Sequence, residues 1–193
     1  MQKCTCDAGV KHRERCRIDG MWSQAGIPSR FLDFRLESSP VFSAVWGYGV
    51  EGSHFLWGDV GRGKTGLAVG IARRQLEMGV GSLLFVSVPD LLSELRDTYN
   101  SDTSELNIIN RYADVPLLIL DDLGAEQAKN TEWIEDRLYQ VINRRHGEMK
   151  PTIITSNLSL RQLSHRIGIR NTERVRELCG DNIIEIRGSN LRD

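Results

Sequence analysis

A glycine-rich segment at residues 58–65 reads GDVGRGKT and ends in a lysine and a threonine. These letters match the pattern G-x-x-x-x-G-K-[ST] at every fixed position. Glycine at such places lets the backbone curl until successive N–H groups converge on phosphate oxygens at the positive end of a helix. Lys64 is then expected to contact the outer phosphates of ATP, and the Thr65 hydroxyl to bind Mg²⁺. The residues predicted to hold the nucleotide are Gly58, Asp59, Val60, Gly61, Arg62, Gly63, Lys64, Thr65 and Gly66.

Asp121 and Asp122 are adjacent carboxylates that follow the apolar run at residues 117–120. In an open α/β sheet the carboxyl ends of the strands meet at the edge where ligands bind, so the pair should emerge beside the phosphate loop. We expect Asp121 to hold Mg²⁺, directly or through water, and Asp122 to polarise the water that attacks the γ-phosphate. A strand-ending turn without chemistry is the alternative interpretation.

A third polar group follows the apolar run at residues 152–156, where the next residue is Asn157. Its amide could reach the water between the nucleotide and the acidic pair, and Thr155 is the second candidate for this role. Taken alone, a serine and an asparagine after a strand are typical of a turn.

These groups need a scaffold to position them, and the sequence alternates between strand and helix patterns from about residue 54 onward. Short apolar runs predict buried strands at residues 54–57, 82–88, 116–120, 152–156 and 182–186. Helical periodicity predicts helices over residues 65–78, 89–99, 131–145, 160–167 and 172–179. This alternation predicts an α/β fold with a parallel sheet and helices on both of its faces.

Length and composition are those of a globular protein of ordinary size, with 193 residues, 40% of them hydrophobic and 26% charged. The formal net charge of −1 gives no global electrostatic argument for nucleic acid. No apolar stretch approaches the roughly 20 residues of a membrane helix, and the N-terminus lacks the apolar core of a secretory signal. We therefore expect a cytoplasmic protein with no membrane partner, whose cysteines are reduced thiols or metal ligands.

Several segments, read together, resemble the DnaC/IstB-like branch of the AAA+ ATPases, which contains helicase loaders and transposition helper ATPases. The segments are LWGDVGRGKTGLAVGIA, LLFVSVPDLLSELRDTY, LLILDDLGAE, TEWIEDRLYQVINRR, PTIITSNLSLRQL and, ahead of them, AGIPSRFLDFRLES. The resemblance implies a P-loop NTPase of the AAA+ type, with a five-stranded parallel sheet sandwiched by helices. It also places Asn157 at sensor I and Arg174 at the arginine finger, with Arg170 and Arg176 as neighbours.

The chain departs from this family pattern in two ways. Asp122 stands where many AAA+ proteins have glutamate, so hydrolysis is expected to be slow. The sequence ends soon after Ile186, which predicts a fold with no C-terminal helical lid and a loosely held nucleotide. We divide the chain into a short basic, cysteine-containing N-terminal arm at residues 1–35 and an AAA+ ATPase domain at residues 36–193.

The arm contains Cys4, Cys6, His12 and Cys16, which could supply four ligands to Zn²⁺. The family often carries a CxxC…CxC knuckle just upstream of its GIP segment, and residues 4–17 resemble a degenerate version. A basic tail with incidental thiols is the alternative.

The resemblance implies a replicative helicase loader, in which ATP drives self-association and controls assembly on the helicase and on single-stranded DNA. One alternative is a transposition helper that uses the same core to mark duplex DNA for a transposase. Another is a regulatory DNA-binding protein that binds ATP as a switch with little turnover. The candidate contacts to DNA are the basic residues of the arm, Arg144, Arg145, the arginines between 161 and 176, and Arg96 with Tyr99.

Overall fold

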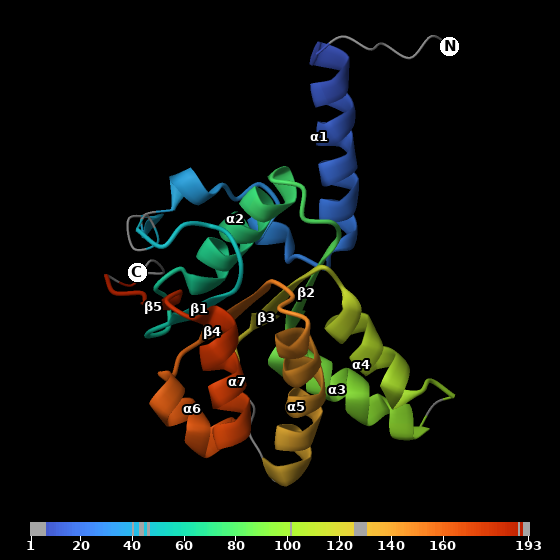
Figure 1. Cartoon of the computed structure of the whole chain (residues 1–193), viewed down its shortest axis with the longest axis vertical. Coiled ribbons are helices and arrows are strands. Elements are labelled where there is room, and N and C mark those ends of the chain that lie inside the picture. The colour runs from blue at the N-terminus through green and yellow to red at the C-terminus, as the bar shows by residue number, and fades with distance from the viewer. Residues whose placement is uncertain are drawn as a thin grey trace.

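The computed structural model describes residues 7–39, 41–42, 45, 47–100, 102–125, 131–188 and 190, and for residues 7–15, 38 and 100 it describes the backbone alone. One sheet runs through the molecule between two layers of helices (Figure 1). Its strands are β1 (His54–Trp57), β2 (Leu83–Ser87), β3 (Leu117–Asp121), β4 (Thr152–Ser156) and β5 (Ile183–Glu185). Their order is β2-β3-β4-β1-β5, and all neighbouring strands are parallel. The predicted five-stranded parallel sheet is confirmed.

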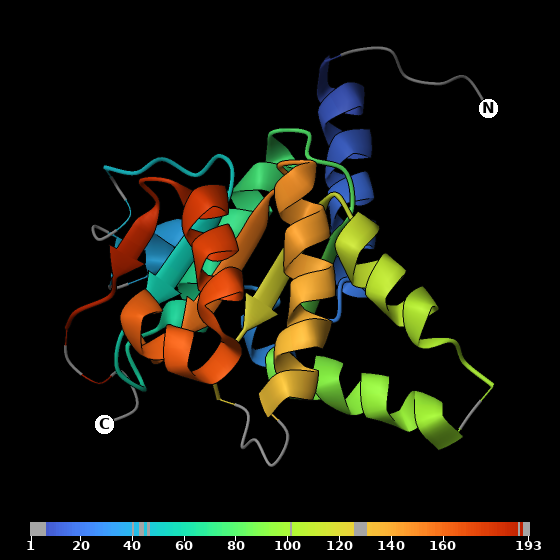
Figure 2. The ribbon, with the colours of Figure 1, turned by 60° about the horizontal axis from the view of Figure 1, so that its bottom comes forward.

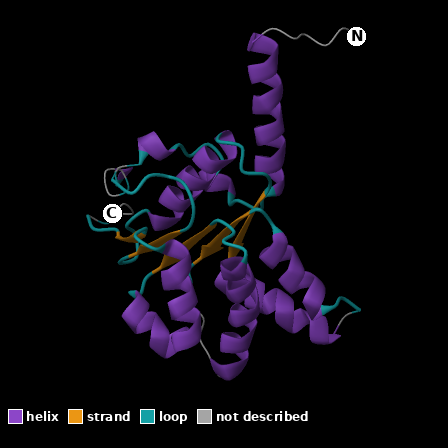
Figure 3. Ribbon diagram, in the orientation of Figure 1, coloured by secondary structure: helices purple, strands orange, loops and turns teal. Residues whose placement is uncertain are grey.

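The helices divide between the two faces of the sheet. They are α1 (Asp7–Gln24), α2 (Lys64–Glu77), α3 (Val88–Asp97), α4 (Glu105–Asp114), α5 (Thr131–Gly147), α6 (Leu160–Ile167) and α7 (Ile169–Cys179). Short 3-10 helices are η1 (Ser29–Phe31), η2 (Leu36–Ser38) and η4 (Thr98–Asn100). Helices α1 and α2 cover one face, and α3 to α7 cover the other (Figure 3).

Strand β3 shows how the sequence builds both cores. Successive side chains of a strand point to opposite faces. Leu118 and Leu120 accordingly belong to the core beneath α3 to α7, whereas Leu117 and Ile119 belong to the core beneath α1 and α2. Because β3 is buried on both faces, its sequence is a continuous apolar run rather than an alternating one.

Two helices lie where none was expected. Helix α4 lies outside the predicted helices and buries Ile108, Ile109 and Tyr112, which recur at helical spacing among polar residues. Helix α1 occupies much of the N-terminal arm, and among its described side chains Ile18 and Trp22 are buried. Two buried apolar side chains are too few to show helical periodicity in the sequence of this segment.

The later half of α1 is held against α2 by one arginine. The guanidinium of Arg73 lies 5.0 Å from the centre of the Trp22 ring and 3.6 Å from the carboxylate of Asp19. The Trp22 indole N–H also donates a hydrogen bond to the carbonyl of Leu32 at 2.9 Å. This part of the arm therefore packs on α2, while the domain boundary at residue 35 stays a prediction.

The zinc hypothesis falls mostly outside the described part of the chain. Cys4 and Cys6 lie outside the described residues, as does the side chain of His12, while Cys16 is exposed on α1. Within the described ranges, no group of three or more His, Cys, Asp or Glu side chains is arranged to hold a metal ion. No helix in that part of the chain is long and apolar enough to cross a membrane.

Candidate nucleotide-binding site

The phosphate loop connects β1 to α2 at the carboxyl edge of the sheet. Gly58 follows β1 with a φ of 144°, and a Cβ atom there would lie 2.5 Å from the carbonyl oxygen of Ile186. Gly63 precedes α2 in the left-handed conformation, with a φ of 81°. A side chain would be strained at either position, which explains why the loop needs glycine there. Helix α2 begins at Lys64, so its first N–H groups are available to an anion at the loop.

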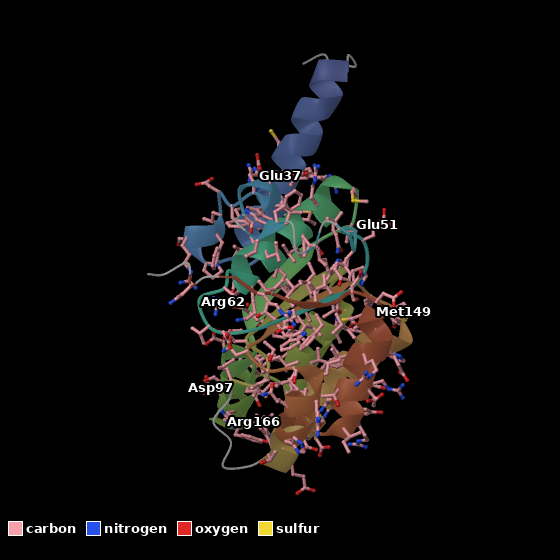
Figure 4. All side chains as sticks on the ribbon, turned by 90° about the vertical axis from the view of Figure 1, so that its left-hand side faces the viewer. Glu37, Glu51, Arg62, Asp97, Met149 and Arg166 are labelled. Atoms are coloured by element: carbon pink, nitrogen blue, oxygen red, sulfur yellow. The ribbon has the colours of Figure 1, made fainter. Side chains whose placement is uncertain are left out.

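The side chain of Lys64 is held inside the loop. Its ammonium group donates hydrogen bonds to the carbonyls of Gly58 at 2.7 Å and Asp59 at 2.8 Å, and to Oδ1 of Asn157 at 2.8 Å. Arg62 lies on the same loop (Figure 4) and pairs with Asp59 at 3.3 Å. The structure thus brings the predicted phosphate ligand Lys64 into contact with Asn157, a residue 93 positions away in the sequence.

Thr65 and Asp121 meet directly. The Thr65 hydroxyl donates to the Asp121 carboxylate, at 3.0 Å from Oδ1 and 3.3 Å from Oδ2. Burial raises the pKa of Asp121, the negative charge of Asp122 raises it further, and hydrogen bonds from Thr155 and Thr65 with the charge of Lys64 oppose the shift. A hydroxyl and a carboxylate are hard oxygen donors of the kind that Mg²⁺ prefers. The donor set therefore fits the predicted magnesium ion.

Asp122 and Asn157 both line the cavity beside the loop. Asp122 is half-buried, and its backbone is left-handed, with a φ of 58°. Asn157 is exposed and follows directly after β4. The two residues predicted to act on the attacking water therefore face the same space as the phosphate loop, although their roles stay predictions.

The cavity has a volume of about 370 Å³, and residues from the segment after α1 also line it. They are Arg30, Phe31, Phe34 and Ser39, which we call the wall residues. Phe34 lies against the first turn of α2, where a Cβ atom on Gly66 would come within 2.9 Å of the Phe34 ring. The rings of Phe31 and Phe34 are in edge-to-face contact with their centres 6.3 Å apart, and the guanidinium of Arg30 lies 4.6 Å from the centre of the Phe31 ring.

These wall residues were missed in the sequence, although they belong to the segment AGIPSRFLDFRLES that carries the family resemblance. Their signal was the close spacing of two phenylalanines and two arginines within residues 30–35. An aromatic wall next to a phosphate loop suits the flat, apolar base of a nucleotide.

Arg174 does not line the cavity in its own subunit. It lies on α7, and its guanidinium donates to Oε2 of Glu177 at 2.7 Å. On the same helix Arg170 lies over the ring of Tyr139 at 4.6 Å, and Arg176 is 3.5 Å from Glu173. The structure therefore separates this arginine from the phosphate loop of the same chain.

One of the candidate DNA contacts is wrong. Arg145 is completely buried and donates its hydrogen bonds to interior acceptors, so it cannot contact a phosphate at the surface. Its neighbour Arg144 is exposed and pairs with Asp114 at 3.0 Å. Core-facing residues of a surface helix recur at a spacing of three or four, and this spacing, followed along α5 through Leu138 and Ile142, includes Arg145 and leaves Arg144 out.

Known proteins resemble this chain in sequence and in structure. A sequence model of the family described as IstB-like ATP binding protein matches residues 52–172. The replicative helicase loader DnaC of Escherichia coli (strain K12) is 32% identical over 120 residues, which cover 62% of this chain and 48% of DnaC. The replicative helicase loader DnaI of Bacillus subtilis (strain 168) is 34% identical over 112 residues, which cover 58% of this chain and 35% of DnaI.

A solved structure extends the similarity beyond the matched sequence. The crystal structure of DnaI has a TM-score of 0.68 and 28% identity, over 86% of this chain and 95% of that one. The sequence matches nevertheless span less than half the length of each loader.

Proposed function

Because the chain belongs to the family of IstB-like ATP-binding proteins, within the AAA+ ATPases, we propose that it hydrolyses ATP and acts as a replicative helicase loader. The observation that carries the proposal is the convergence of Lys64, Thr65, Asp121 and Asn157 at one edge of the sheet. The names of the DnaC and DnaI relatives support the loading role.

In this proposal the loop residues 58–66 hold the phosphates of ATP, and the wall with Phe31 and Phe34 receives the base. Lys64 exchanges some of its carbonyl and amide partners for phosphate oxygens. Thr65 and Asp121 hold Mg²⁺, which when bound neutralises charge on the β- and γ-phosphates. Asp122, which lines the same cavity, orients the attacking water, and Asn157 helps to hold that water in place.

Arg174 completes the site from a neighbouring subunit. The negative charge that develops on the γ-phosphoryl group needs a cation, and an arginine can bridge two phosphate oxygens with its planar fork. Arg174 lies on α7 and does not line the cavity of its own chain, and this supports its assignment to the nucleotide of another copy. ATP would then favour self-association.

Mixing two inactive variants tests this arrangement. Arg174→Ala should bind ATP but lose most hydrolysis, and adding Lys64→Ala protein should restore part of the turnover, because each contributes the half that the other lacks. Arg161→Ala, which removes an exposed arginine on α6, is the control and should keep wild-type turnover. No recovery in the mixture, together with a specific activity that does not depend on protein concentration, would rule out the in-trans arginine.

Single-stranded DNA is the proposed ligand of a group of side chains that we name the Tyr99–Trp133 cluster. It consists of Arg96 on α3, Tyr99 on η4, and Trp133 and Arg137 on α5; the ribbons of these helices can be followed in Figure 2. The Trp133 indole donates to the hydroxyl of Tyr99 at 3.0 Å, and 64% of Tyr99 is exposed. The guanidinium groups of Arg96 and Arg137 lie 4.9 Å and 5.5 Å from the centre of the Trp133 ring. Exposed aromatic rings beside arginines can stack on bases and attract the phosphate backbone without reading the sequence.

Tyr99→Ala should therefore weaken binding of an oligothymidylate by about 10-fold, since stacking on one aromatic ring contributes about 1–3 kcal/mol. The matched control is Tyr48→Ala, because Tyr48 is also an exposed tyrosine but lies outside the cluster. Equal affinities of the two variants, measured by fluorescence anisotropy at one salt concentration, would remove the cluster from DNA binding.

The loading role itself is tested with the replicative helicase of the host. The purified chain and ATP should increase the amount of that helicase retained on circular single-stranded DNA, and Lys64→Ala should not. Binding to a transposase and to duplex DNA instead would favour the transposition helper. Nucleotide-dependent DNA binding without helicase retention and without turnover would favour the regulatory switch.

Zinc in the N-terminal arm is a separate part of the proposal. If Cys4, Cys6, His12 and Cys16 bind Zn²⁺, freshly purified protein should carry about one equivalent of zinc, and Cys6→Ser/Cys16→Ser should lose it. Metal analysis that finds no zinc in reductant-protected protein would discard this site and leave the ATPase proposal unchanged.

A further inference from the structure

Thr155 lies at the carboxyl end of β4, between the strands that carry the two halves of the site. In the sheet, β4 pairs with β1, which leads into the phosphate loop, and with β3, which leads into the acidic pair. The residue opposite Thr155 on β1 is Leu56. Thr155 is completely buried and does not line the cavity, so its hydroxyl is not placed to touch the attacking water.

The buried hydroxyl of Thr155 is bonded to both acids. It donates a hydrogen bond to Oδ1 of Asp121 at 2.6 Å and accepts one from the backbone N–H of Asp122 at 3.0 Å. The carbonyl of Thr155 accepts a third bond, from the backbone N–H of Leu123 at 2.9 Å. One residue of β4 therefore holds three consecutive residues at the end of β3.

The hydrogen bond between Thr155 and the N–H of Asp122 also supports an unusual backbone conformation at Asp122. With a φ of 58°, Asp122 adopts a left-handed backbone, which residues other than glycine rarely adopt without local support. The hydrogen bond from its N–H to Thr155 is such support, and the turn is extended by a bond from the N–H of Ala125 to the carbonyl of Asp122. Because the backbone direction decides where a side chain leaves the chain, this contact sets where the Asp122 carboxylate meets the cavity.

We propose that Thr155 is a positioning residue for ATP hydrolysis, and the inference rests on the proposed ATPase function. Its hydroxyl fixes the Asp121 carboxylate on the magnesium side and the Asp122 backbone on the water side, so the two acids keep a constant separation. Thr155 does not sense the nucleotide; it aligns the residues that act on it.

The test compares three variants of the full chain. Thr155→Val removes the hydroxyl at nearly constant volume, Thr155→Ser keeps the hydroxyl, and Thr152→Val makes the same change at a buried threonine three residues earlier on β4. The Thr152 hydroxyl bonds to the Lys150 carbonyl and to Arg145 and has no contact with the acidic pair. Phosphate release at saturating ATP and Mg²⁺, binding of a fluorescent ATP analogue, and thermal unfolding are measured for each.

We expect Thr155→Val to lower turnover by about 10- to 100-fold, the usual effect of losing a group that orients a metal ligand, while nucleotide affinity changes by less than about threefold. Thr155→Ser should recover most of the turnover, and Thr152→Val should keep it. Turnover that is the same in Thr155→Val and Thr152→Val, per folded molecule, would overturn the proposal. Should Thr155→Val not fold, Thr155→Ala removes the same hydroxyl and is compared in the same way.

A double variant separates this inference from the proposed function. If Thr155 acts through Asp122, Thr155→Val should cause little further loss of turnover in an Asp122→Asn background, because residues that act as one unit are not additive. A full additional 10-fold loss in that background would overturn the part of the role that acts through Asp122 and leave only the contact with Asp121. If Asp122→Asn alone keeps wild-type turnover, the failure is in the proposed function of Asp122 instead.

Discussion

Two buried cations, Lys64 and Arg145, stand at opposite edges of the same sheet. The exposed fractions of the two residues are 6% and 0%, and both donate hydrogen bonds to backbone carbonyls. Lys64 lies at the carboxyl edge beside the cavity. Arg145 lies near the amino ends of β3 and β4, where the carbonyls of Pro116 and Pro151 accept its hydrogen bonds.

Arg145 connects one helix to two strands. Its guanidinium donates to carbonyls at the end of α4 and at the start of β3 and β4, and to one hydroxyl on β4. The acceptors are the carbonyls of Tyr112, Ala113, Val115, Pro116 and Pro151 and the hydroxyl of Thr152, at 2.6–3.5 Å. Burial lowers the pKa of Arg145 to about 10, and the charges of Asp114 and Glu148 oppose the shift. The carbonyls of Tyr112 and Ala113 belong to the last turn of α4, where a helix leaves its carbonyls without partners of its own, and the carbonyl of Pro151 also accepts a bond from the N–H of Leu118 at 3.3 Å.

The comparison teaches that a buried cation can serve either stability or binding, depending on what lies next to it. The planar fork of an arginine matches several fixed carbonyls at once, and Arg145 does not line the cavity beside the phosphate loop. A lysine has three donors on one rotatable ammonium group, and Lys64 faces a cavity where phosphate oxygens can replace its present acceptors. The hydrogen bonds of Arg145 to carbonyls are therefore permanent, whereas those of Lys64 can be exchanged for bonds to phosphate.

The largest effect is expected for Arg145→Met. Removing the guanidinium leaves several buried carbonyls without donors, and each such loss costs about 1–3 kcal/mol where it is not relieved. We expect the free energy of unfolding in urea to fall by about 3–5 kcal/mol, a large part of the roughly 5–15 kcal/mol that a domain has.

The neighbouring residue supplies the control for that change. Arg144→Met removes an exposed guanidinium paired with Asp114 and should lower the free energy of unfolding by less than about 1 kcal/mol. Similar losses for the two variants would mean that Arg145 contributes no more than an ordinary surface pair.

The next effect concerns binding rather than stability. Lys64→Ala should weaken ATP binding by more than about 100-fold, since two charge-assisted hydrogen bonds to phosphate contribute about 1.5–3 kcal/mol each. Its free energy of unfolding should change by much less than that of Arg145→Met, because its acceptors face a cavity that water can enter. Isothermal titration with ATP and Mg²⁺ measures the first quantity, and urea unfolding the second.

Lys150→Ala, which removes a lysine at the other edge of the sheet, is the matched control and should bind ATP normally. An affinity of Lys64→Ala within a few-fold of wild type would contradict the phosphate-loop assignment. A stability loss as large as that of Arg145→Met would contradict the contrast between the two cations.

The same contrast explains what the sequence could and could not predict. Lys64 and Thr65 end a glycine-rich motif, and Asp121, Asp122 and Asn157 follow directly after apolar runs. Local patterns therefore located these residues, and the parallel sheet brought them together. Roles that depend on contacts between distant segments leave no local pattern.

The residues whose roles were not predicted depend on such contacts between distant segments. Arg145 reads as one of two adjacent surface arginines. Thr155 reads as a second candidate for contact with the attacking water, whereas its buried hydroxyl bonds to Asp121 and to the N–H of Asp122. Phe31 and Phe34 acquire meaning only when their segment packs against α2. Helix α4 shows a pattern that could have been found, because its buried residues recur at helical spacing.

The smallest predicted effect concerns His54, the first residue of β1. It lies at the amino ends of the strands, as Arg145 does, and away from the cavity. This side chain is completely buried, and its ring nitrogen Nε2 lies 3.2 Å from the carbonyl of Gly49. Burial lowers the pKa of His54 below its usual 6.5, although hydrogen bonds to the backbone at Gly49 and Gly52 oppose the shift.

The direction of the pH effect follows from the lowered pKa. Below about pH 6.5 the unfolded chain takes up a proton at His54 that the folded chain resists, so the unfolded state is favoured there. The contribution of His54 to the free energy of unfolding should be fully present above about pH 6.5 and fall as the pH drops below it, by at most about 1.4 kcal/mol for each pH unit.

His54→Gln cannot be protonated and should remove this part of the pH dependence of the unfolding free energy between about pH 6.5 and 5. His165→Gln, at an exposed histidine on α6, should keep it. Because His54 lies away from the cavity, ATP affinity should not follow the same pH dependence. A slope that persists unchanged in His54→Gln would show that acid weakens the fold through other groups, and that the edge of the sheet opposite the nucleotide does not respond to pH near neutrality.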